Sequence, residues 1–103
     1  MELRHIHYFL VLSEEKSFTK AAEKLLIAQP PLSRQIKDLE EELGVPLFIR
    51  SPRGVALTEA GVKFRQYALQ IEHLSHQSIE VVKEMNKGLQ GTLYIASVEG
   101  RAP

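Results

Sequence analysis

The chain has 103 residues, which is one domain's worth of sequence. Apolar residues make up 44% and charged residues 25%, a composition that favours a globular protein over a disordered one. Basic and acidic side chains number 13 each, so a uniformly basic surface is excluded and any nucleic-acid surface must come from local clustering. The absence of cysteine excludes disulfides, thiolate metal sites and cysteine nucleophiles. No apolar run could span a bilayer and the first residues do not resemble a signal peptide, so we expect a cytoplasmic protein.

The balanced net charge hides a local separation of charge. Positions 16–37 hold five basic side chains and one acidic side chain, whereas positions 38–42 hold four acidic side chains. Arg50 and Arg53 form a second basic spot. One short region therefore has a cationic end and an anionic end.

The first 43 residues have the period of three helices. Residues 3–15 are apolar on more than one side, which indicates a helix with several neighbours. Ser17 is a good N-cap for a second helix at 18–25. Leu26 follows at the break between the second and third helices, where glycine would be usual, and a left-handed backbone would be strained there for leucine. A third helix is predicted at 30–43, with prolines in its first turn and glycine after its end. Its buried stripe is Leu32, Ile36, Leu39 and Leu43.

A small β-hairpin is predicted at 47–57, with turn residues and two arginines near its tip. Thr58 caps a long helix that can run to about residue 87. Residues 92–96 form a strand-like run at the start of the segment 90–103, which we interpret as the beginning of a second domain that the chain does not contain.

The long helix has a heptad seam with one polar interruption at Ser78. We expect a second copy of the chain to cover this seam, because the helix has no core of its own and little chain remains. The alternative is an intramolecular helix hairpin. The predicted dimer seam consists of Phe64, Tyr67, Ile71, Leu74, Val81 and Met85, with Ala60 at its start.

Together these elements predict a mainly α fold: a winged helix-turn-helix with a small hairpin wing, followed by a long dimerisation helix. The DNA major groove admits one α-helix, and the exposed side of the third helix has side chains of the types that read base edges. The cationic N-terminal end of this helix should face the DNA and the acidic end should point away. The predicted base-reading residues are Gln29, Pro30, Pro31, Ser33, Arg34 and Lys37.

Other polar residues suit the DNA backbone. The second helix of such a motif crosses the phosphates, which assigns Ser17, Thr19 and Lys20 to backbone contacts. Arg50 is also assigned to a phosphate. Arg53, at the wing tip, suits the adjacent minor groove.

Five blocks of sequence resemble the LysR-type transcriptional regulators of bacteria. They are FTKAAEKL at 18–25, AQPPLSRQI at 28–36, LEEELG at 39–44, LFIR at 47–50 and LTEAG at 57–61. The match covers residues 1–61 continuously, and the long helix agrees with the family's linker helix. The opening residues and the block at 28–35 particularly resemble the regulators of aromatic catabolism.

The resemblance implies a DNA-binding domain at 1–58, with the helix-turn-helix at 18–37, and a linker helix at 59–89. Family members pair their linker helices antiparallel, so that two winged domains face one inverted-repeat site in double-stranded DNA. They usually form tetramers through a C-terminal effector domain that binds a small inducer. That domain is absent here, and residues 91–98 resemble its first strand.

Some residues also suit other functions. His73 and His76 lie three apart on a helix and could belong to a metal site, although histidines on a polar helix face seldom do. No glycine-rich phosphate loop and no catalytic grouping is present, so we expect neither an enzyme nor a cofactor. A coiled-coil module that docks protein rather than DNA is the alternative function. It predicts association that is insensitive to salt, whereas binding through phosphates weakens steeply with salt.

Overall fold

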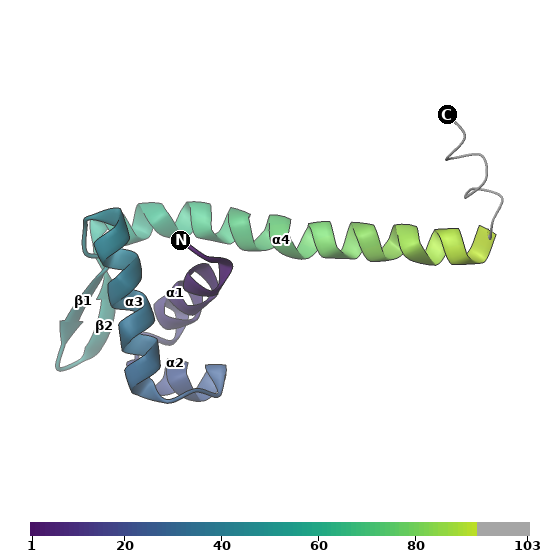
Figure 1. The fold of residues 1–103 in the computed structure, drawn as a ribbon. Helices are drawn as coiled ribbons and strands as arrows, with labels where there is room; N and C mark the ends of the chain where they lie inside the picture. The colour runs from purple at the N-terminus through teal and green to yellow at the C-terminus, as the bar shows by residue number, and fades with distance from the viewer. Residues whose placement is uncertain (93–103) are drawn as a thin grey trace. The chain divides into compact units, whose positions relative to one another are not determined.

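The computed structural model describes residues 1–92, and the side chains of residues 1–88. The chain divides into two units, Met1–Glu72 and His73–Pro103, and each is described by itself. The elements, drawn in Figure 1, are α1 (Leu3–Glu15), α2 (Phe18–Leu25), α3 (Gln29–Leu43), β1 (Phe48–Ser51), β2 (Gly54–Leu57) and α4 (Glu59–Thr92). Three helices, a two-stranded wing and a long helix confirm the predicted mainly α winged helix-turn-helix.

The core of the first unit lies where α1, α2 and α3 meet. The helix α1 buries residues on several sides, as its sequence predicts, and Ile6, Phe9 and Leu12 are almost fully buried. The small residues Ala21 and Ala22 of α2 are also buried, which lets the helices approach closely. The stripe of α3 is buried as predicted, except at Leu43, which is 38% exposed. Leu43 is the last residue of α3, and the core ends before it.

Three phenylalanines join the helices to the wing and to α4. The ring of Phe9 lies 5.2 Å from that of Phe48 on β1, and 4.9 Å from that of Phe64 on α4 in an edge-to-face arrangement. Such aromatic pairs stabilise the folded state by more than the burial of their apolar area alone would. Phe9 therefore fixes the wing strand and the start of α4 against α1.

Among residues 1–92, two residues other than glycine have left-handed backbones, and both end a helix. Lys16 follows α1 with φ 57°, and Leu26 follows α2 with φ 60°. The backbone N–H of Leu26 donates to Glu23 O at 3.1 Å, and its side chain is 91% exposed. The turn between α2 and α3 thus has the conformation that glycine usually supplies, and leucine bears the strain without any compensating burial.

The wing is an antiparallel hairpin that is fixed at its base. Phe48 pairs with Leu57 and Ser51 with Gly54 across a two-residue turn. Gly54 has φ 125°, and an added Cβ there would lie 2.6 Å from the carbonyl oxygen of Lys16. The next residue, Val55, donates its N–H to that same oxygen at 3.0 Å. The end of α1 thereby holds the start of β2, and glycine is needed for the close approach.

The start of α4 is tied to the loop before the wing. Thr58 caps the helix as predicted: its Oγ1 accepts from Gly61 N at 2.9 Å and donates to Pro46 O at 2.8 Å. Ala68 is fully buried, and Phe64 and Ile71 pack against the core of the first unit. The expectation that this helix has no core of its own is therefore wrong for its first part, because one face of it completes the winged domain.

The helix α4 continues to Thr92, beyond the predicted end near residue 87. The predicted strand-like run began at Thr92, which lies in α4, and its remaining residues lie outside the described part of the chain. Within residues 1–92, no helix combines the length and the apolarity needed to cross a membrane.

Gly61 is required by packing, although the sequence marks it only as a weak point in a helix. A Cβ added at Gly61 would clash with the backbone oxygen of Leu47. We expect Gly61→Ala to lower the free energy of unfolding by about 1–3 kcal/mol, because α4 must move off the loop. Thermal and denaturant unfolding followed by circular dichroism measures this.

Gly88→Ala is the matched control, because a Cβ there would meet no atom of the described residues within 4 Å beyond the adjacent backbone of its own helix. It should raise helix stability slightly, since alanine is the better helix former. Equal unfolding curves for Gly61→Ala and the unchanged protein would contradict the close packing of α4 on the loop.

Candidate nucleic-acid interface

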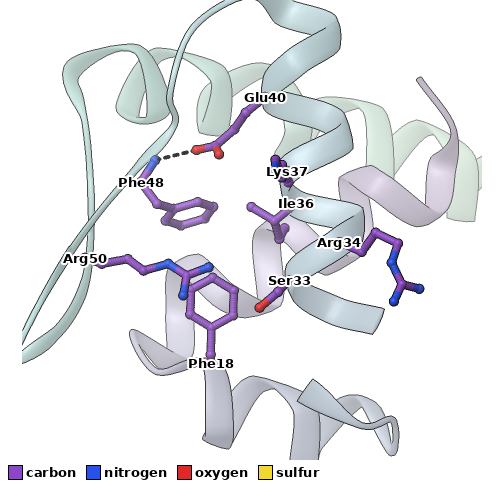
Figure 2. Close-up of a pocket in the computed structure, with 8 residues that line it drawn as sticks. All are labelled: Phe18, Ser33, Arg34, Ile36, Lys37, Glu40, Phe48 and Arg50. Carbon is purple, nitrogen blue, oxygen red and sulfur yellow. Dashed lines mark hydrogen bonds between the residues drawn. The ribbon is translucent and has the colours of Figure 1, made fainter. Parts of the chain in front are cut away.

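A groove of about 550 Å³ runs between α3 and the wing, within the first unit. Figure 2 shows that α2, α3 and β1 all contribute side chains to it. Its lining combines an apolar floor with polar and cationic groups: Phe18, Ser33, Arg34, Ile36, Lys37, Glu40, Phe48 and Arg50. Four of these eight residues were predicted to contact DNA, so the fold brings together side chains that are separated in the sequence.

The predicted base-reading residues lie on one exposed side of α3. Gln29, Arg34 and Lys37 are exposed, and Ser33 is half-buried in the wall of the groove. The guanidinium of Arg34 points away from the groove (Figure 2). Within the described part of the chain, the side chains of Ser33, Arg34 and Lys37 make no hydrogen bond or ion pair. Pro30 and Pro31 are exposed in the first turn, as their positions predict.

The start of α2 is organised around Ser17. Its Oγ accepts from Lys20 N at 3.1 Å, which confirms the predicted N-cap. The Thr19 hydroxyl donates to Gln29 Oε1 at 3.4 Å. Thr19 and Gln29, predicted to contact backbone and base respectively, are therefore in contact with each other. Lys20 is exposed and, within the described residues, forms no ion pair.

The two wing arginines differ in their surroundings. Arg53 lies in the two-residue turn with an exposed side chain, and its backbone N–H donates to Ser51 Oγ at 3.2 Å. Arg50 extends from β1 across the groove, and its Cζ lies 4.0 Å from the centre of the Phe18 ring. Sequence patterns did not predict this contact, because they do not specify which strand residue faces the start of α2.

The acidic end of α3 has structural roles that the sequence did not reveal. Glu40 accepts hydrogen bonds from Leu47 N at 2.7 Å and Phe48 N at 3.1 Å, so it fixes the loop that enters the wing. Glu42 pairs with the N-terminal ammonium of Met1 at 2.8 Å. Two of the four clustered acids are therefore engaged within the fold, away from the N-terminal end of α3. These two acidic side chains therefore anchor the far end of α3 within the fold.

Two more contacts of α4 fall outside the sequence predictions. His7 Nδ1 lies 2.8 Å from Glu72 Oε2, and Arg65 Nε donates to Ser13 Oγ at 3.3 Å. Both join α1 to the part of α4 in the first unit. The described residues contain no group of three or more histidine, cysteine, aspartate and glutamate side chains that could hold a metal ion.

The predicted dimer seam divides between core and surface. In the first unit, Phe64 and Ile71 contact the core, and Tyr67 is 63% exposed. In the second unit, the predicted residues Leu74, Val81 and Met85 are exposed by 61%, 51% and 63%. Two further apolar residues of this unit, Ile79 and Val82, are also exposed. The second unit therefore has a broad apolar surface on a single helix, which is unusual for a segment without a partner.

Comparison with known proteins adds an independent line of evidence. Residues 3–62 match the family described as bacterial regulatory helix-turn-helix protein, lysR family. The chain is 52% identical over 95 residues to the HTH-type transcriptional regulator BudR of Klebsiella aerogenes, covering 92% of this chain and 66% of that protein. It is 53% identical over 85 residues to the HTH-type transcriptional regulator BenM of Acinetobacter baylyi, covering 82% of this chain and 28% of that protein. The chain thus spans less than two thirds of the length of these relatives.

Solved structures agree with these matches. The crystal structure of the BenM DNA-binding domain in complex with catB site 1 DNA superimposes with a TM-score of 0.81 at 52% sequence identity. The superposition covers 84% of this chain and 97% of that one. The chain therefore has the same fold as a DNA-binding domain whose structure was solved in complex with DNA.

Proposed function

This chain belongs to the lysR family of bacterial regulatory helix-turn-helix proteins, and on that basis we propose that it binds double-stranded DNA in a sequence-specific manner. It would act as the dimeric DNA-binding part of a transcription regulator, in the cytoplasm, where the bacterial chromosome lies. The solved complex of the similar BenM domain with DNA supports this proposal.

One observation carries the proposal: three side chains of α3 that suit base reading, Ser33, Arg34 and Lys37, have no polar partner among the described residues. Arg34 and Lys37 are exposed, and Ser33 lines the groove beside them. Arginine pairs bidentately with guanine, and serine bonds to several base edges. With Gln29, Pro30 and Pro31, these residues form the surface of α3 that enters the major groove.

The remaining polar residues position the protein. Ser17, Thr19 and Lys20 lie together at the start of α2. The guanidinium of Arg50 reaches Phe18 at that same end of α2, which suits contacts to phosphates. Arg53 at the exposed turn of the wing suits the adjacent minor groove. Residues 1–58 thus form the DNA-binding domain, with 18–37 as its helix-turn-helix.

Residues 59–89 act as the linker helix that pairs two copies. The exposed apolar side chains of the second unit support this role, because burying them requires a partner. Two paired winged domains would meet the half-sites of an inverted repeat. In a longer protein, an effector domain after residue 90 would bind the small-molecule inducer and complete a tetramer.

Arg34→Ala and Lys20→Ala separate base reading from backbone binding. We expect Arg34→Ala to weaken binding to a preferred duplex by about 1–3 kcal/mol and to relax base preference at one position. Lys20→Ala should weaken binding to every duplex similarly and reduce the salt dependence. Titrations on matched and scrambled duplexes at several salt concentrations measure both effects.

Equal losses on every duplex for Arg34→Ala would remove the base-reading role of Arg34. Binding to protein that is insensitive to salt, without any preference for duplex DNA, would favour the alternative of a protein-docking module.

Leu74→Glu tests the pairing of α4. Leu74 is exposed and lies in the second unit, whereas Ile71 packs on the core and would confound the result. We expect Leu74→Glu to give a monomer with weakened DNA binding, because a buried unpaired carboxylate opposes association. Sedimentation velocity measures the mass.

His76→Glu is the matched control, because the same glutamate then stands roughly 160° around the helix from Leu74. It should leave the mass of the dimer unchanged. A Leu74→Glu protein with the mass of a dimer would place the interface elsewhere.

A further inference from the structure

The contact between Arg50 and Phe18 joins the wing to the first residue of α2. The guanidinium Cζ of Arg50 lies 4.0 Å from the centre of the Phe18 ring, and Figure 2 shows the guanidinium against that ring, close to Ser33. The Phe18 side chain is 7% exposed, so the core holds the ring in place. A cation against a fixed aromatic face is attracted by the ring quadrupole, and an arginine can stack on it with its planar group.

The guanidinium of Arg50 lies against an aromatic ring but, unlike several other cationic groups of the first unit, it has no polar partner within the part of the chain that the structure describes. Arg4 pairs with Glu2, Lys24 with Glu15, and Arg65 donates to Ser13. Within the described residues, the guanidinium of Arg50 makes neither a hydrogen bond nor an ion pair. The aromatic contact leaves the N–H groups at the edge of its plane available, and a guanidinium presents five of them in a rigid fork.

We propose that Phe18 is a positioning residue for DNA binding: its ring fixes the guanidinium of Arg50 so that the N–H groups meet one phosphate beside the recognition helix. This inference rests on the proposed function and deepens it. Phe18 touches no DNA in this account. It contributes to affinity because an arginine already held in its bound orientation loses less rotamer freedom when it binds.

A double-mutant cycle of Phe18→Leu and Arg50→Gln tests the proposal. Leucine keeps the apolar character of the buried site but has no aromatic face, and glutamine removes the charge. Affinities are measured on a preferred duplex and on a duplex of mixed sequence, at a temperature where thermal unfolding shows every variant folded. Arg50→Gln should weaken binding roughly tenfold on both duplexes. Phe18→Leu should weaken it about threefold on both, the size of a cation–π contact.

The decisive result is the coupling between the two changes. In the Arg50→Gln background, Phe18→Leu should have no further effect on affinity, because the group that Phe18 positions is gone. Phe48→Leu is the control: Phe48 lines the same groove but its ring contacts Phe9. Phe48→Leu should change the affinity by the same factor in the unchanged protein and in the Arg50→Gln background. Equal losses from Phe18→Leu in both backgrounds would make Phe18 merely structural and overturn the proposal.

If Phe18→Leu does not fold, nuclear magnetic resonance of the unchanged protein tests whether the guanidinium of Arg50 is held against the Phe18 ring. The side-chain protons of Arg50 should shift upfield from those of Arg53, which stands exposed in the wing turn and contacts no aromatic ring of the described residues. Matching shifts for the two arginines would overturn the proposal. An unchanged protein that binds no duplex would overturn the proposed function itself, whereas binding without coupling would overturn only the role of Phe18.

Discussion

The burial of one stripe on α3 determines which side chains the protein presents to its surroundings. Leu32 and Leu39 are fully buried and Ile36 is 3% exposed, so α3 cannot rotate about its axis without breaking the core. Burying three large aliphatic side chains stabilises by several kcal/mol, at roughly 2 kcal/mol each. The opposite side of the helix is therefore exposed by necessity. Arg34 and Lys37 lie on this side and are exposed because the core fixes the rotation of the helix.

The surroundings of α3 fix its two ends in different ways. At the far end, Glu40 binds the backbone before the wing and Glu42 binds the N-terminus, so acidic groups stabilise the fold away from the cationic end. At the near end, the prolines begin the helix and Thr19 contacts Gln29. The wing is fixed by the same core, through Phe9 and Phe48. The packing of the core therefore determines which side of α3 is exposed.

Local sequence patterns predict most of this fold for identifiable reasons. Ser17 and Thr58 are caps whose hydrogen bonds the structure contains, and the period of α3 predicts its buried stripe. The contacts that patterns missed join different elements of the fold, and they include Arg50 with Phe18, Glu40 with Phe48, and α4 with α1. Heptad spacing on α4 could not distinguish a face that packs on the chain's own core from one that awaits a partner. Phe64 packs on the chain's own core, whereas Leu74 is exposed.

The sequence predicts which residues belong to the candidate site better than it predicts how they are arranged in space. The sequence predicts the exposed side of α3, because exposure there follows from helical period alone. It does not predict that Ser33 lies half-buried in a groove closed by the wing, since that depends on where the hairpin packs. The pairing of Thr19 with Gln29 also depends on the turn at Leu26, whose left-handed backbone the sequence flagged only as strained.

Selection of duplexes from a random-sequence library tests the central claim most directly, because it asks whether the exposed side of α3 reads bases at all. The account predicts enrichment of one inverted repeat, with half-sites about one or two helical turns apart on one face of the duplex. A bound pool as diverse in sequence as the starting library would contradict it.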